Sequence, residues 1–172
     1  DNVDFILGGH ATSSGVIPGC IAAEKYQTYY HATAAFSPPW MEHGFKWSTL
    51  LFFNIGQAAS VPFHIWDRLP PDQRPSKAAL FMEDTFGGKA FGKAFREKAD
   101  TFGYRIVMDV VLDVNIGDVA SQIARAKALG VDAILMHASV DDCLAVVRSM
   151  KQIDYHVKYL HGWKGTWPKE FW

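Results

Sequence analysis

The fold is decided by residues 77–98, which read Lys77-Ala-Ala-Leu-Phe-Met-Glu-Asp-Thr-Phe-Gly-Gly-Lys-Ala-Phe-Gly-Lys-Ala-Phe-Arg-Glu-Lys98. The apolar run from Ala78 to Met82 is too short for a helix and has the length of a buried strand. After Gly87-Gly88, apolar residues recur with the period of a helix, at Phe91, Ala94, Phe95, Ala99 and Phe102. Residues 104–112 are rich in β-branched side chains and predict the next strand. The unit is therefore βαβ, and its right-handed crossover requires a parallel sheet.

The same alternation of strand and helix extends over the whole chain. Further strands are predicted at residues 3–7, 28–31, 48–53, 131–137 and 157–161, the first of them buried. The only proline-rich connector is Leu69-Pro-Pro-Asp-Gln-Arg-Pro-Ser76, and domain boundaries favour such segments. We therefore predict an α/β protein with two lobes, residues 1–73 and 74–172. In parallel sheets ligands bind beyond the carboxyl ends of the strands, which makes Glu83 to Gly88 the first candidate functional segment.

Composition restricts the class of protein. The chain has 172 residues, of which 49% are hydrophobic and 20% charged, as in soluble globular proteins, and this excludes disorder. The net charge of −1 provides no basic surface for nucleic acid or an anionic membrane. No segment approaches the ~20 apolar residues of a membrane span. Cys20 and Cys143 fall in helical patterns, which favours core positions over a disulfide.

A glycine-rich segment raises the possibility of nucleotide binding. Residues 87–93 fit the phosphate-loop pattern G-x-x-x-x-G-K, but Ala94 stands where a Ser or Thr should reach Mg²⁺. A two-glycine loop followed by an amphipathic helix explains the same residues. An α/β enzyme that binds a nucleotide or flavin with the Gly87 loop is therefore the alternative hypothesis.

Four histidines and Ser14 are candidates for metal binding or catalysis. His10, His31, His137 and His161 each fall at or just past the predicted carboxyl end of a strand. Each histidine could donate a hydrogen bond to a ligand or could be a partly buried structural residue. The sequence lacks metal-binding spacings such as H-x-H. Ser14 lies near His10, but the G-x-S-x-G motif is missing and no acid is placed to orient a base. We therefore predict no catalytic residue, no metal and no cofactor.

A loop rich in glycine and hydroxyl groups precedes the first helix. It reads Gly8-Gly-His-Ala-Thr-Ser-Ser-Gly15, and Ser13 or Ser14 is the natural N-cap. Backbone N–H groups, hydroxyls and the helix dipole converge there, which favours an anion site.

Several segments occur in the order of a known family. They are Val3-Asp-Phe-Ile-Leu-Gly-Gly-His-Ala-Thr-Ser-Ser14, Tyr29-Tyr-His-Ala-Thr-Ala-Ala35, Glu83-Asp-Thr-Phe-Gly-Gly-Lys-Ala-Phe91, Asp118-Val-Ala-Ser-Gln-Ile123 and Gly130-Val-Asp-Ala-Ile-Leu135. The sequence resembles the branched-chain amino-acid (Leu/Ile/Val-binding) type of ABC-transporter substrate-binding protein, which has the type I periplasmic binding protein fold. The resemblance covers nearly all of this chain but only part of a usual family member. It implies a fragment with part of one Rossmann-like lobe, a crossover near Pro70 to Pro75, and much of the other lobe.

The resemblance also implies a function. Members of the family capture a ligand between two α/β lobes, and closure of the lobes signals to an ABC permease in the membrane. The expected location is periplasmic or extracytoplasmic, with a lipid anchor left open. A sensory ligand-binding domain of the same fold is a further alternative.

Candidate ligand-binding residues follow from the resemblance. Ser14 and nearby backbone N–H groups would hold the ligand's carboxylate, and Thr33 and Ala35 would lend backbone and hydroxyl groups. Ser13 and His10 are further candidate ligand-binding residues. Three further positions depart from the family pattern, with Phe86 in place of a tyrosine, Ser139 in place of an aromatic residue, and Lys164 near the acid that usually pairs with an ammonium. A lysine there would repel an ammonium and attract a carboxylate. The expected ligand is therefore a small carboxylate, an organic or aromatic acid in preference to an amino acid.

Overall fold

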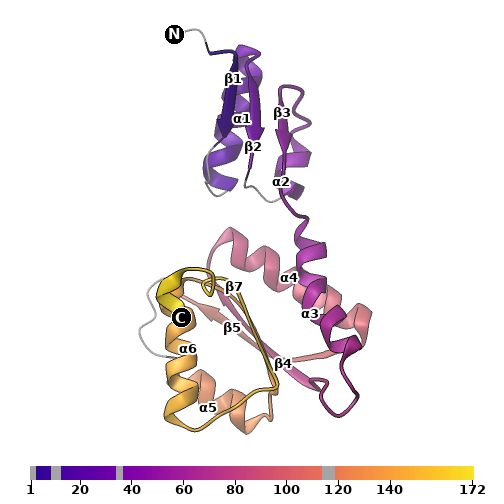
Figure 1. Cartoon of the computed structure of the whole chain (residues 1–172), viewed down its shortest axis with the longest axis vertical. Helices are drawn as coiled ribbons and strands as arrows, with labels where there is room; N and C mark the ends of the chain where they lie inside the picture. The colour runs from indigo at the N-terminus through magenta and orange to yellow at the C-terminus, as the bar shows by residue number, and fades with distance from the viewer. Residues whose placement is uncertain (1–2, 9–12, 34–36, 114–118) are drawn as a thin grey trace. The chain divides into compact units, whose positions relative to one another are not determined.

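The computed structural model describes residues 3–8, 13–33, 37–113 and 119–172, without the side chains of residues 13, 14 and 37–39 (Figure 1). The chain forms two compact units, residues 1–58 and 59–172. The chain passes from one unit to the next within helix α3 (Ile55–Arg68), upstream of the proline-rich connector. The end of α3 belongs to the second unit because Phe63 stacks on Phe102 and Trp66 packs on Tyr104. The division of lobes at residues 73 and 74 stays a prediction for the whole protein.

The first unit contains a three-stranded parallel sheet in the order β1-β2-β3. Its elements are β1 (Phe5–Gly8), α1 (Ser13–Tyr26), β2 (Tyr29–Ala32), α2 (Ser37–Glu42) and β3 (Ser48–Leu50). One face of the sheet is packed, and its core consists of Val16, Cys20, Ala23, Tyr30 and Ala32. The parallel pairing agrees with the predicted alternation of strand and helix.

The prediction that the first strand is buried is wrong. Phe5 is 53% exposed and Leu7 is 68% exposed, whereas Ile6 packs against the core of the unit. Strand β1 lies at the edge of its sheet, and its side chains alternate between the two faces. Within the described residues, only the face that carries Ile6 belongs to a core, so the hydrophobic run of β1 is half exposed.

The second unit contains a four-stranded parallel sheet in the order β5-β4-β6-β7, covered by helices on both faces (Figure 1). Its strands are β4 (Lys77–Glu83), β5 (Arg105–Leu112), β6 (Ala133–Ala138) and β7 (Tyr159–Lys164). The remaining elements are α4 (Phe86–Phe102), α5 (Ala120–Ala128), α6 (Val140–Gln152) and the 3-10 helix η1 (Lys169–Phe171). The predicted βαβ unit and its parallel sheet are confirmed.

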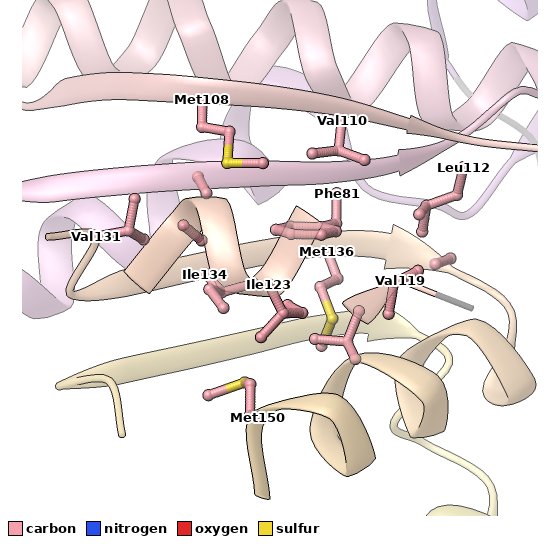
Figure 2. Packing of buried hydrophobic residues seen from close by; sticks show 14 of the residues in the cluster. Phe81, Met108, Val110, Leu112, Val119, Ile123, Val131, Ile134, Met136 and Met150 are labelled. Atoms are coloured by element: carbon pink, nitrogen blue, oxygen red, sulfur yellow. The ribbon is translucent and has the colours of Figure 1, made fainter. Parts of the chain in front are cut away.

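The two faces of this sheet have separate cores. Phe81, Ile134 and Met136 point from the sheet toward Ile123 of α5 and Met150 of α6 (Figure 2). On the opposite face, Phe91 of α4 stacks on His137 with ring centroids 4.7 Å apart. Strands β4 and β6 are buried on both faces, which explains their continuous apolar runs.

Helix α4 begins earlier than the sequence predicts. Thr85 is its N-cap and accepts a hydrogen bond from the backbone N–H of Gly88 at 3.1 Å, so Gly87 and Gly88 form the first turn. A Cβ at Gly88 would lie 2.0 Å from the carbonyl oxygen of Glu83, so only glycine allows this close approach. The connection from β4 is therefore Asp84-Thr85 alone. The glycine loop required by the nucleotide-binding alternative is not present here, because these glycines are helical.

Strand β7 continues to Lys164, further than the predicted end at residue 161. His161 is therefore in the middle of a strand, and the prediction that it lies at the carboxyl end is wrong. The prediction that Cys20 and Cys143 are core residues is confirmed, because both are buried free thiols. Ser139 caps α6 by accepting a hydrogen bond from the Asp142 N–H. Within the described ranges, every helix is too short or too polar to span a bilayer.

Candidate functional site

The carboxyl ends of three neighbouring strands bring charged residues together in the second unit. Strand β6 pairs with β4 on one side and with β7 on the other. In this register Met82 lies beside His137, and Ala138 lies beside Lys164. Glu83, the last residue of β4, therefore reaches both His137 and Lys164, although Lys164 is 81 positions away in the sequence.

Glu83 is the centre of this cluster. Its Oε1 atom accepts hydrogen bonds from Lys164 Nζ at 2.5 Å and from Thr85 Oγ1 at 2.8 Å. His137 Nδ1 lies 3.3 Å from the same oxygen. The Glu83 side chain is only 9% exposed. The carboxylate is therefore almost buried and is held by groups from β6, β7 and the start of α4.

The ionisation of Glu83 follows from these contacts. Burial by itself raises the pKa of the carboxyl group, but hydrogen bonds from His137, Lys164 and Thr85, with the positive charge of Lys164, lower the pKa to about 2. Glu83 is consequently an anion at neutral pH, and Lys164 is its counter-ion.

Lys164 has an unusual backbone. Its φ of 53° lies in the left-handed region, which is unfavourable for residues other than glycine. Such a conformation is retained where the surrounding structure requires it, frequently at functional sites. The Lys164 side chain is 42% exposed, unlike that of Glu83. The lysine is thus anchored on a buried carboxylate at one side and reaches solvent at the other.

Aromatic rings lie next to this cluster. The ring centroid of Trp163 lies 5.1 Å from that of Phe91. Trp163 also makes an edge contact with Trp167, with ring centroids 5.1 Å apart. Trp167 and Phe86 are both exposed. The carboxyl edge of the sheet therefore combines an accessible cation with flat apolar surfaces.

The predicted site residues of the second unit lie at this edge. Phe86 begins α4 directly after β4, Ser139 follows β6, and Lys164 ends β7. Two of them already have intramolecular partners. Ser139 Oγ donates to Asp142 Oδ2 at 2.6 Å, and Lys164 donates to Glu83. The structure therefore supports their common location and leaves their contact with a ligand as a prediction.

The predicted site residues of the first unit are only partly described. Thr33 follows β2 and its hydroxyl donates to the carbonyl of Gly8, the last residue of β1, at 2.9 Å. Helix α1 begins at Ser13, close to the predicted start. His10, Ala35 and the side chains of Ser13 and Ser14 lie outside the described residues, and their roles stay predictions.

Sequence reasoning missed Glu83 as an individual residue. It indicated the segment from Glu83 to Gly88, but it treated Lys164 as a free cation. A signal existed, because an acid at the end of a buried strand needs a partner, and Lys164 was predicted in the loop that follows the last strand. The prediction of no metal rests on residue spacing in the sequence. Among the described residues, the structure contains no group of three or more His, Cys, Asp or Glu that could hold a metal ion.

The candidate histidines His31 and His161 have different surroundings. His31 Nδ1 lies 2.8 Å from Thr49 Oγ1. His161 is enclosed between Tyr159, Trp163 and Phe95, and its Nε2 atom is buried with no hydrogen-bond partner. Burial lowers the pKa of His161 to about 4. This ring is therefore neutral in the folded protein at neutral pH.

His161 predicts a pH-dependent stability. Its folded pKa of about 4 lies below the ordinary value of 6.5, so between these values the unfolded chain binds more protons. The contribution of His161 to the free energy of unfolding is therefore fully present above pH 6.5. It decreases as the pH falls toward 4, by roughly 3 kcal/mol between these two pH values. His161→Phe should flatten this part of the profile in denaturation experiments, whereas the exposed His156→Gln should keep it. Parallel profiles for wild type and His161→Phe would contradict the assignment.

Comparison with known proteins gives a consistent result. A protein-family profile described as periplasmic binding protein matches residues 1–169. A search of curated proteins finds no match. Among solved structures, the branched-chain amino acid transporter substrate binding protein from Streptococcus pneumoniae, in complex with isoleucine, has a TM-score of 0.79 at 18% identity. That alignment covers 98% of this chain and 46% of the other.

Two other solved structures carry different ligands. An ABC transporter substrate-binding protein from Desulfitobacterium hafniense, in complex with Leu, has a TM-score of 0.74 at 18% identity, covering 93% of this chain and 47% of the other. A solute binding protein of an ABC transporter from Rhodopseudomonas palustris BisB5, in complex with 3,4-dihydroxy benzoic acid, has a TM-score of 0.67 at 14% identity. That alignment covers 87% of this chain and 40% of the other. This chain spans less than half of the length of each of these proteins.

The two parallel α/β sheets define part of a type I periplasmic binding protein fold. This agrees with the fold class that the sequence predicts. Because the family profile matches nearly the whole chain, the chain belongs to the periplasmic binding protein family.

Proposed function

We propose that this chain is the ligand-binding part of an extracytoplasmic solute-binding protein of an ABC importer. The whole protein would capture a small carboxylate-bearing ligand between two lobes, close by a hinge and deliver the ligand to a membrane permease without chemical reaction. Family membership supports solute binding, and the named ligands of the similar structures all carry a carboxyl group. The lipid anchor stays a prediction.

One observation supports this function most directly. Lys164 places an ammonium group at the carboxyl edge of the second sheet, where ligands of parallel α/β sheets bind. One of its three N–H donors binds Glu83, and the side chain is 42% exposed, so a ligand can reach the ammonium from solvent. A ligand carboxylate can accept from these donors while Phe86 and Trp167 contact its apolar part.

The same arrangement disfavours a free amino acid. The α-ammonium of an amino acid would meet a like charge at Lys164, and Glu83 is already neutralised by that lysine. A carboxylate without an α-ammonium, such as an aromatic or short organic acid, fits better. In the first unit, Ser14 and the N–H groups at the start of α1 are further proposed donors to a ligand carboxylate.

Ser14→Ala tests the carboxylate site. Loss of a hydrogen bond to a charged ligand is expected to weaken binding roughly 5- to 100-fold. A thermal-shift screen of organic acids, aromatic acids and amino acids on the whole protein would first identify the ligand, and titration calorimetry would then measure its dissociation constant. The exposed Ser121→Ala on α5 is the matched control and should bind as wild type. An unchanged dissociation constant for Ser14→Ala would contradict the proposal.

A further inference from the structure

The partners of Glu83 differ in how far they reach toward solvent. His137 and Glu83 have side chains that are 4% and 9% exposed, whereas Lys164 is 42% exposed. Lys164 is therefore the outer member of the cluster, and it covers the carboxylate from the solvent side. Among the described residues, its ammonium makes one hydrogen bond, to Glu83 Oε1.

The inner part of the cluster is fixed independently of Lys164. Thr85 donates to Glu83 and at the same time caps α4 by accepting from Gly88 N–H. The ring of His137 is stacked on Phe91, which is fully buried. Glu83 itself is the last residue of a strand that pairs on both sides. Removal of the lysine side chain would therefore leave an oriented, nearly buried carboxylate that opens to solvent.

Such a carboxylate has a defined preference for its occupant. An isolated buried charge is costly, so the group favours a cation. The oxygen that faces Lys164 accepts hydrogen bonds, and an ammonium supplies a charge together with N–H donors in the manner of the lysine it replaces. A bare alkali cation supplies no donor. A small primary ammonium is thus the best replacement.

We propose that Glu83, Thr85 and His137 form a receptor for a primary ammonium group, and that the Lys164 side chain occupies this receptor within the chain. A tethered group acts at a high effective concentration, so free amines in solution do not displace it. The receptor exists independently of the proposed function. Its consequence for ligand choice, namely that amine-bearing ligands are excluded while Lys164 is present, rests on that function.

Chemical rescue of Lys164→Ala tests the receptor. Alanine keeps a Cβ and therefore the same backbone constraint at residue 164, but it removes the ammonium and opens the path to Glu83. Added methylammonium or ethylammonium chloride should raise the thermal unfolding temperature saturably, with half-saturation in the millimolar range. Equal concentrations of potassium chloride or tetramethylammonium chloride, which have no N–H donor, should give a smaller and non-saturating effect.

Matched variants separate the receptor from general salt effects. Wild type, Lys89→Ala and the double variant Glu83→Gln/Lys164→Ala should show no specific response to methylammonium, since their receptor is occupied or lacks its charge. If Lys164→Ala does not fold by itself, its refolding yield with methylammonium against potassium is the readout. Rescue by potassium to the same extent, or rescue that persists in the double variant, would overturn the proposal. No carboxylate ligand enters this experiment, so its failure is distinct from failure of the Ser14→Ala test.

Discussion

Lys164→Ala is expected to lower the free energy of unfolding by about 3 kcal/mol. The substitution leaves the carboxylate of Glu83 nearly buried, with its strongest donor removed. Removing the cation costs more than the pair contributed, because the nearly buried charge of Glu83 is left uncompensated. Guanidinium denaturation followed by tryptophan fluorescence measures the change.

Lys89→Ala is the matched control for this prediction. Lys89 Nζ lies 2.6 Å from Asp84 Oδ1, nearly the same distance as in the Lys164 pair, but its side chain is 72% exposed. An exposed pair of this kind contributes at most about 1 kcal/mol. The variant Glu83→Gln/Lys164→Ala should recover part of the loss, since no buried charge remains. Equal effects of the two lysine substitutions would show that burial of Glu83 does not determine the stability of its pair.

Gly88→Ala is expected to destabilise the second unit by about 3 kcal/mol or more, at the upper end of overpacking substitutions. The added methyl group would lie 2.0 Å from the carbonyl oxygen of Glu83, which is backbone and has no rotamer through which to move. The first turn of α4 would have to shift away from β4 and would move the cap residue Thr85 with it. Guanidinium denaturation again gives the free energy.

Gly92→Ala, on the same helix, separates the close contact from helix propensity. A Cβ there would meet Met82 Cγ at 3.3 Å, which is part of a flexible side chain. Alanine also favours the helix over glycine by about 1 kcal/mol. The two effects oppose each other, so the stability of Gly92→Ala should stay within about 1 kcal/mol of wild type. If Gly88→Ala were equally tolerated, the close approach of α4 to β4 would be wrong.

Local patterns were sufficient for much of the second unit. The period of Phe91, Ala94, Phe95 and Ala99 predicted the buried face of α4, because a helix that covers a sheet must place its apolar residues on one side. The start of α6 is fixed by an equally local contact, the hydrogen bond from Asp142 N–H to Ser139. By contrast, an apolar run in β1 did not show whether both of its faces are covered, since burial depends on what packs against the strand.

The candidate site was predictable only as a place. The resemblance to the family assigned Phe86, Ser139 and Lys164 to one ligand site, and in the structure all three lie at the carboxyl edge of the second sheet. Their partners could not be assigned, because pairing depends on which strands are neighbours. The ion pair between Glu83 and Lys164 exists because β6 lies between β4 and β7 and has the register that aligns their ends.

For this protein the amino-acid sequence by itself determined the alternation of strands and helices and the parallel direction of the sheets, which follow from short-range periodicity. The family was indicated by the resemblance of several segments in the order of known members. Only the tertiary structure decided that Lys164 is bound to a buried acid and that Gly87-Gly88 belongs to a helix. The reason is physical, since burial and charge pairing are set by groups far apart in the chain that meet when the sheet forms.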